Sequence, residues 1–196
     1  ANADTNWAQE DVSDASGNVL QTLLHNGAPN NGPFSDVADT DVDLETLTVS
    51  AVNGVGGNVG APVTGTYGTL TLGVSGAYTY ILNDAHVAVN ALDDGETITD
   101  VFNYTATDGT DSASATLTIT IFGKNDAPVA LADTNWAQED GPDASGNVLQ
   151  TLVHSGAPDA GPYSDVADTD VDLETLTVSA VNGLDTNVGT AVAGLY

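Results

Sequence analysis

The chain of 196 residues contains no cysteine, no methionine, no arginine and a single lysine. Without cysteine it forms no disulfide and performs no thiol chemistry. Because 28 acidic residues face one basic residue, the formal net charge is −27. Nucleic acid and anionic membrane surfaces would repel such a chain. Its natural partners are therefore cations.

Long apolar runs are also lacking. No stretch is apolar enough for a signal peptide or a membrane span, and no methionine could initiate the chain, so the sequence reads as part of a larger protein. Hydrophobic residues still make up 41%, which favours a folded chain over a disordered one. Abundant Thr, Asn, Asp and Gly favour β-strands with polar turns.

Residues typical of catalysis are scarce. The three histidines, His25, His86 and His154, are scattered, and two of them occupy the same position of a repeat. The sequence has no G-x-S-x-G elbow and no phosphate-binding glycine loop. Paired carboxylates carry no information in a chain this acidic. The sequence predicts that the protein is not an enzyme.

An internal repeat organises the chain. With an offset of 129, residues 3–67 and 132–196 agree at 51 of 65 positions, and the differences cluster where turns are expected. We therefore predict one complete repeat over 1–126, with a C-terminal linker from 123, and the first half of a second copy over 127–196. The linker GKNDAPVA contains Pro128, which restricts its predecessor to extended geometry and makes the connection stiff.

Alternating apolar and polar residues predict about seven strands in one repeat. Residues 18–24 are expected to form one strand, and in 45–53 the side chains of Leu47, Val49 and Ala51 are expected on one face. Two hairpins follow, one across VSG and one across DGTD, and in the last strand apolar residues alternate with threonines. Trp7, on the first strand, is expected in the core. Short strands with regular turns predict a two-sheet sandwich.

The acidic residues gather in short runs. The segment SDVADTDVDLETLTVS spans 35–50 and recurs unchanged at 164–179, with five acids in its first eleven positions. Like charges this close repel, so the runs predict a bound cation; the alternative is a solvated acidic surface. Calcium takes about six to eight oxygen ligands in irregular geometry. An EF-hand is excluded because Leu44 and Ser50 replace its glycine and glutamate. The candidate ligands are Glu10, Asp11, Asp39, Asp41, Asp43, Asn125 and Asp126.

Longer motifs carry a family resemblance. Residues 65–129, with YGTLTL, GAYTY and ATLTITIFGKNDAPV, resemble the VCBS repeat of very large bacterial surface adhesins, and SGNVLQT with DTDVDLETLTVSAV is similar to the cadherin-like half that precedes it. Together they cover essentially the whole chain. The resemblance implies an all-β, Ig/cadherin-like Greek-key β-sandwich of about seven strands in tandem repeats, exported by a type I pathway.

The same resemblance implies calcium at the junctions between domains, held by a strand-end acidic motif, a D-x-D motif and the linker Asn-Asp pair. In the second copy these motifs fall on Glu139 and Asp140, on Asp168 and Asp170, and Asp172 ends the repeated DTDVD. The sequence departs from the family pattern at Leu44 and Glu45, where many relatives have Gly-Asp, which leaves the ligand geometry of that turn open.

These observations predict a structural extender module of a secreted bacterial adhesin, rigidified by calcium and acting in adhesion or biofilm matrix. The expected partners are neighbouring repeats or other copies of the chain, without nucleic acid or membrane insertion, and any adhesive ligand would bind elsewhere in the parent protein. The expected location is extracellular or at the cell surface. The alternative is a subunit of a matrix filament assembled by β-strand complementation, because the second copy lacks two hairpins and open edges seek partners. A carbohydrate-binding module would need exposed aromatic side chains on one face.

Overall fold

The computed structural model describes residues 1–194 and divides the chain into two compact units, Ala1–Asn125 and a second unit that begins at Asp126. Each is described by itself. Nearly all regular structure is β, with two short 3₁₀ turns, η1 (Gly56–Asn58) and η2 (Asp185–Asn187). No described helix is long and apolar enough to cross a membrane.

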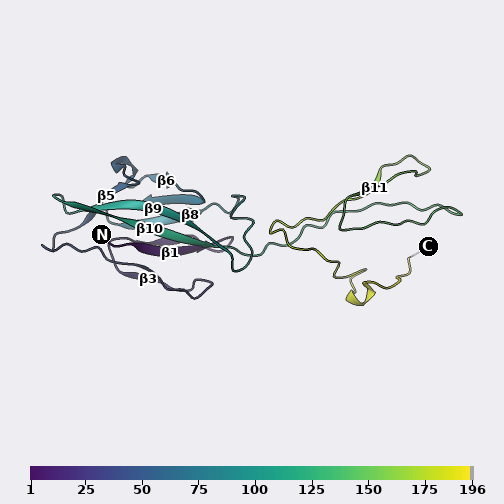
Figure 1. Cartoon of the computed structure of the whole chain (residues 1–196), viewed down its shortest axis with the longest axis horizontal. Helices are drawn as coiled ribbons and strands as arrows, with labels where there is room; N and C mark the ends of the chain where they lie inside the picture. The colour runs from purple at the N-terminus through teal and green to yellow at the C-terminus, as the bar shows by residue number, and fades with distance from the viewer. Residues whose placement is uncertain (195–196) are drawn as a thin grey trace. The chain divides into compact units, whose positions relative to one another are not determined.

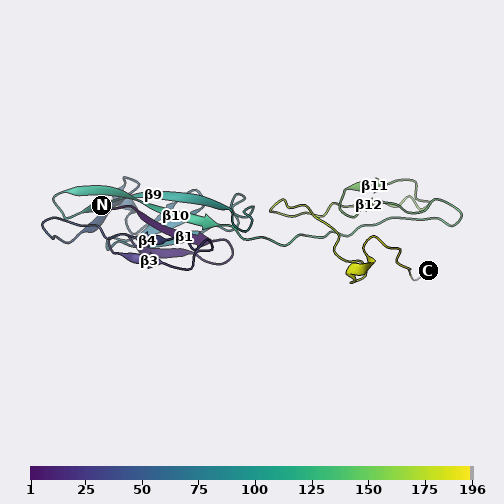
Figure 2. The ribbon, with the colours of Figure 1, turned by 60° about the horizontal axis from the view of Figure 1, so that its bottom comes forward.

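Two four-stranded sheets form the first unit (Figures 1 and 2). The first sheet has the order β1 (Asp4–Gln9), β10 (Ser112–Phe122), β9 (Thr97–Thr107), β5 (Thr48–Val52). The second has the order β2 (Ala15–Asn18), β8 (Ala77–Leu82), β7 (Gly68–Leu72), β6 (Pro62–Thr64). A small hairpin of β3 (Leu23–His25) and β4 (Phe34–Asp36) lies beside β1. The unit is an all-β sandwich, as the sequence predicted.

The predicted hairpins β7–β8 and β9–β10 are confirmed. On β10, Leu117, Ile119 and Ile121 point inward and are fully buried, while the threonines between them point outward. They belong to the same core cluster as Phe102 of β9, in the same sheet, and Tyr80 of β8, in the opposite sheet. Alternation of this kind fixes the register, because a slip by one residue would expose the whole apolar set.

Three local predictions are wrong. The expected strand over 18–24 is broken by a turn, so that β2 belongs to one sheet and β3 to a separate hairpin. In β5 the register shifts between Val49 and Ala51, and the bulge buries Val52 in place of Ala51. Trp7 lies outside the core between the sheets, half-buried and edge-to-face with Phe122. The opposite face of β1 is the one that enters the core.

The second unit contains the hairpin of β11 (Leu152–His154) and β12 (Tyr163–Asp165), and an isolated bridge between Val129 and Thr169. Residues 68–122 occur only once in the chain, so the strands that cover the inward positions of the first unit have no repeated counterpart here. Val148, for example, is 47% exposed, whereas the equivalent Val19 is fully buried.

Candidate functional site

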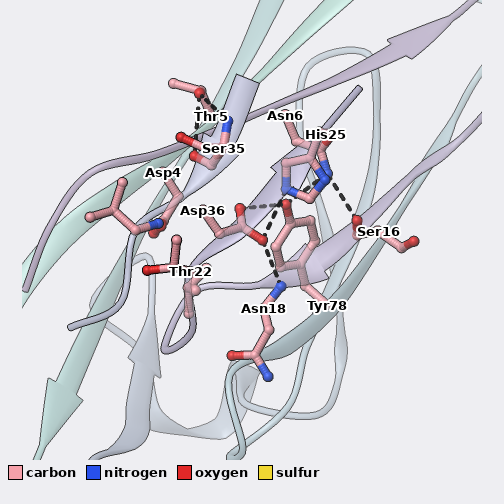
Figure 3. Close-up of polar contacts among 12 residues, drawn as sticks. Asp4, Thr5, Asn6, Ser16, Asn18, Thr22, His25, Ser35, Asp36 and Tyr78 are labelled. Carbon is pink, nitrogen blue, oxygen red and sulfur yellow. Dashed lines mark hydrogen bonds and ion pairs between the residues drawn. The ribbon is translucent and has the colours of Figure 1, made fainter. Parts of the chain in front are cut away.

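A buried polar cluster centres on Asp36, at the end of β4 (Figure 3). Its Oδ1 accepts a hydrogen bond from the Tyr78 hydroxyl at 2.9 Å, and its Oδ2 accepts one from the Asn18 amide at 2.7 Å. Nε2 of His25 lies 3.0 Å from the same Oδ2, without the alignment of a hydrogen bond. A Cβ on Gly17 would lie 2.2 Å from Oδ2, so glycine makes room for the carboxylate. Asp36 is fully buried, although it belongs in sequence to the acidic run that begins at Ser35.

The cluster does not have the connectivity of a catalytic triad. Asn6 Nδ2 donates to the Tyr78 hydroxyl at 2.8 Å and to the Ser16 carbonyl at 3.0 Å. The carboxylate of Asp36 bridges the tyrosine and the histidine, whereas in a triad the imidazole bridges the nucleophile and the carboxylate. Burial, followed by the charge of Asp36, raises the pKa of Tyr78, so its hydroxyl stays protonated and serves as a donor. The hydrogen bonds satisfy the buried polar groups of Asn6, Asp36 and Tyr78.

Two further tyrosine–carboxylate contacts follow the same principle. Asp100 of β9 accepts hydrogen bonds from the Tyr80 hydroxyl at 3.0 Å and from the amides of Thr66 and Tyr67 at 3.1 and 3.0 Å. Gly65 again stands where a Cβ would lie 2.2 Å from the carboxylate. In a chain almost without basic residues, tyrosine hydroxyls and backbone amides replace lysine and arginine as the partners of buried acids.

The third contact lies near the N-terminus. Asp39 accepts a hydrogen bond from the Asn2 amide at 2.5 Å, and the Tyr104 hydroxyl lies 3.1 Å from its Oδ2. Asp4 accepts the Val37 amide at 2.8 Å, and burial raises its pKa from the usual 3.8 to about 7. Asp4, Asp36 and Asp100 were not predicted from the sequence. The signal that could have indicated them is the set of inward-facing tyrosines on β8 and β9, because buried hydroxyls need hydrogen-bond partners.

The second unit repeats the histidine–aspartate contact. Nε2 of His154 lies 2.9 Å from Oδ1 of Asp165, whose Oδ2 accepts the Asn147 amide at 2.7 Å. These two contacts, that of His154 first, lower the pKa of Asp165. Gly146 occupies the position of Gly17 and makes room in the same way. The arrangement is thus encoded in the repeated half of the unit, while Tyr78 comes from the part that occurs once.

The predicted calcium ligands in DTDVD of the first unit do not converge. Asp41 Oδ1 accepts the backbone amides of Asp43 at 2.8 Å and Glu45 at 3.4 Å, so the loop folds back on its own backbone. Leu44 has a φ of 62° and is 90% exposed. The side chain of Asp43 is exposed, and Asp39 is engaged by Asn2 and Tyr104, as described above. The turn Asp108–Asp111 likewise uses the Asp108 carboxylate to bind two amides, which lowers its pKa.

At the other end of the first unit, the predicted residues Glu10 and Asn125 each contact a residue that was not predicted, Lys124 and Asp94. Glu10 is 1% exposed, and its Oε2 accepts the Lys124 amide at 3.4 Å. The amide of Asn125 donates to Asp94 Oδ1 at 3.2 Å. Asp94 was not among the predicted residues. Asp11 is exposed, and its backbone amide donates to Asp84 Oδ1 at 3.1 Å.

At the start of the second unit, three predicted residues contact one another: Asp126, Asp170 and Asp172. Asp172 Oδ2 accepts the Asp126 amide at 2.6 Å, and the amide of Asp172 donates to Asp170 Oδ1 at 2.9 Å. The remaining oxygens, Asp170 Oδ2 and Asp172 Oδ1, are buried without a hydrogen-bond partner. Asp168 accepts the Leu131 amide at 2.7 Å, as Asp39 accepts Asn2. The predicted residues Glu139 and Asp140 do not take part in this cluster, because both are exposed at the end of the segment ADTNWAQED in the second copy.

Carboxylate oxygens are the donors that calcium prefers, and two buried carboxylate oxygens without partners suit such an ion. Within residues 1–194, however, no three histidine, aspartate or glutamate side chains are placed as a set that could hold a metal. The donor chemistry therefore fits calcium, but the described side chains do not form a coordination shell.

Comparison with known proteins agrees with the architecture. A family model described as a bacterial cadherin-like domain matches residues 2–123, which is nearly all of the first unit. No curated protein matches the chain.

Proposed function

The chain belongs to the bacterial cadherin-like domain family, whose domains are structural adhesion modules, typically at the bacterial surface; from this premise we propose that it is an extender module of a secreted adhesin, stiffened by calcium at its linker. In this role the module spaces other parts of the parent protein, in adhesion or in a biofilm matrix, and performs no chemistry.

One observation carries the proposal: a carboxylate binds the backbone amide of each of three successive linker residues. Glu10 binds Lys124 and Asp94 binds Asn125 within the first unit, and Asp172 binds Asp126 within the second. The acids are thus held at the linker, where one lysine is the only basic side chain. Within the second unit, Asp170 and Asp172 lie together, and the repulsion between these two carboxylates would be relieved by a divalent cation.

The expected affinity is low, because extracellular calcium modules bind with dissociation constants of about 10⁻⁴ to 10⁻³ M. At calcium concentrations about twentyfold above the dissociation constant, one site would stabilise the folded state by about 1.8 kcal/mol. Calcium would bind outside the cell, where it is abundant, and the linker would stiffen only after export.

The test is calorimetric titration with calcium, with magnesium as the ion control, followed by small-angle scattering in calcium and in chelator. We expect saturable calcium binding, a higher melting temperature and a less flexible particle. Asp172→Asn should weaken binding about tenfold or more, since it removes a charged ligand. Asp43→Asn, the same change at the equivalent exposed position of the first copy, should have a smaller effect. No calcium-dependent change in melting temperature or scattering would refute the proposal.

A further inference from the structure

The outer faces of the strands carry no charge. Within residues 1–194 the strands contain four acidic side chains, and each is at most 3% exposed: Asp4, Asp36, Asp100 and Asp165. The single lysine lies in the linker. All exposed acids therefore lie in turns and linkers. A typical soluble surface is about 25–35% charged, with both signs interspersed, so uncharged sheet faces on a chain of −27 are unusual.

The two eleven-residue strands, β9 and β10, present one such surface on their outer face, here called the hydroxyl face. Its central cross-strand pairs are Val101 with Thr118, Asn103 with Thr116, and Thr105 with Ser114. The last pair shares a hydrogen bond of 2.9 Å between hydroxyl oxygens. Val101 is 50% exposed at the centre of the face. Charge depletion is what marks the core of protein interfaces.

The distance from this face to the nearest acids decides whether two copies could meet. Each strand has eleven residues and is therefore about 36 Å long. Acids lie at both ends, Asp93, Asp94 and Glu96 before β9 and Asp108 and Asp111 in the turn. The middle of the face is then about 18 Å along the strands from either end, roughly two Debye lengths at physiological salt. Repulsion is screened there at physiological salt and strong at low salt.

The sheet edges, in contrast, are poorly suited to adding a strand. The edge strand β6 has three residues and begins with Pro62, and β2 has four. The edge strand β5 carries the bulge at Val49 and Ala51. The edge strand β1 is flanked by β4, where Thr5 and Ser35 exchange hydrogen bonds. These features disfavour edge-to-edge pairing with another chain. The outer faces of the described strands, in contrast, have no charged side chains that would repel a second copy.

We propose that the hydroxyl face is the contact surface of a weak, symmetric dimer of this chain. A second copy is the favoured occupant because it brings the same uncharged face and keeps its acids at the ends of the strands. A sugar ligand would need an exposed aromatic platform, and Trp7, which pairs with Thr120 of β10, is half-buried against Phe122.

The size of the face sets the strength of the dimer. Two strands about 4.8 Å apart and about 36 Å long give roughly 350 Å² of sheet, to which β1 and β5 add their shorter lengths. A stable complex buries about 800 Å² per partner. The contact is therefore weak and reversible.

Sedimentation equilibrium of the whole chain tests this, in chelator so that calcium plays no part. At about 10 mM NaCl, where the Debye length is about 30 Å, we expect a species of 19.7 kDa. At about 500 mM NaCl we expect twice that mass, with a concentration-dependent distribution. Because no calcium is present, failure here leaves the extender proposal intact, and the reverse also holds.

Val101→Asp places a carboxylate at the centre of the face and should weaken the dimer about tenfold or more. Ile81→Asp is the matched control: Ile81 is 60% exposed on the outer face of β8 in the other sheet, and its substitution should leave the dimer unchanged. A chain that stays monomeric at all salt concentrations would overturn the proposal. So would dimers that persist in Val101→Asp, dimers lost equally in both variants, or a monomer that instead binds a neutral polysaccharide through Val101.

Discussion

Replacing Tyr78 with phenylalanine isolates the energetic role of the buried cluster. The substitution removes one hydroxyl and leaves the ring, so it creates almost no cavity. That hydroxyl donates to Asp36 Oδ1 at 2.9 Å and accepts from Asn6 Nδ2 at 2.8 Å. A hydrogen bond to a charged group contributes about 1.5–3 kcal/mol, and a buried donor left without its partner adds to the loss. We expect the first unit to lose about 2–3 kcal/mol of unfolding free energy, or about 5–10 °C in melting temperature for a domain of this size.

Urea unfolding measures this effect if the signal comes from the first unit alone. In a Trp136→Phe background, fluorescence reports on Trp7, which packs against Phe122 of β10. Tyr80→Phe should cost less, because Asp100 keeps two backbone amides. Tyr163→Phe, which removes a hydroxyl bonded to Asp159 in the second unit, should leave the unfolding of the first unit unchanged. If Tyr78→Phe is as mild as Tyr163→Phe, the cluster does not stabilise the sandwich as described.

Two further substitutions test the surroundings of the cluster. Burial raises the pKa of Asp4 to about 7 in the folded state, so the folded chain binds more protons than the unfolded chain between about pH 4 and 7, and stability falls as pH rises through that window. Asp4→Asn should remove this part of the pH dependence, measured by urea melts at pH 5 and pH 8. Asp133→Asn, the counterpart in the second unit, should not remove it. Gly17→Ala should destabilise the first unit by about 2 kcal/mol or more in the same assay, because the new Cβ would lie 2.2 Å from Asp36 Oδ2. Gly57→Ala has open space around it and serves as the control; equal effects at the two glycines would contradict the packing described.

The parts of the fold that could be predicted are those in which local pattern and tertiary environment agree. In β10, threonines alternate with Leu117, Ile119 and Ile121, so one strand with one buried face follows from the sequence. The errors have non-local causes. The parallel pairing of β1 with β10 joins residues more than a hundred positions apart. This pairing decides which face of β1 enters the core, and it leaves Trp7 on the other face. The bulge in β5 depends on its pairing with β9, which the alternation of Val49 and Ala51 does not reveal.

For the candidate site, too, the sequence predicts some features and not others. Acid-rich runs show where carboxylates occur, but not which of them are buried, because burial depends on partners supplied by distant strands. In the sequence nothing distinguishes Asp36 from Asp39 and Asp41. In the fold, however, Asp36 is buried and accepts a hydrogen bond from Tyr78, 42 residues away. Glu10, Asn125 and Asp126 were predicted from sequence as calcium ligands. In the structure Glu10 Oε2 accepts the Lys124 amide, whereas Asn125 and Asp126 donate their backbone amides to Asp94 and Asp172.

The distribution of charge links the two proposals. Asp36 and Asp100, inside the sandwich, are paired with tyrosine and amide donors and need no cation, whereas Glu10, Asp126 and Asp172 lie at the linker. A cation can therefore affect the linker without being required for the folding of the first unit, and we expect chelation to change flexibility more than the unfolding of that unit. Since the sheet faces are uncharged, salt should promote lateral contact by screening the turns, with no specific ion needed. Magnesium and sodium at matched ionic strength should then be equivalent for the dimer, whereas only calcium should stiffen the linker.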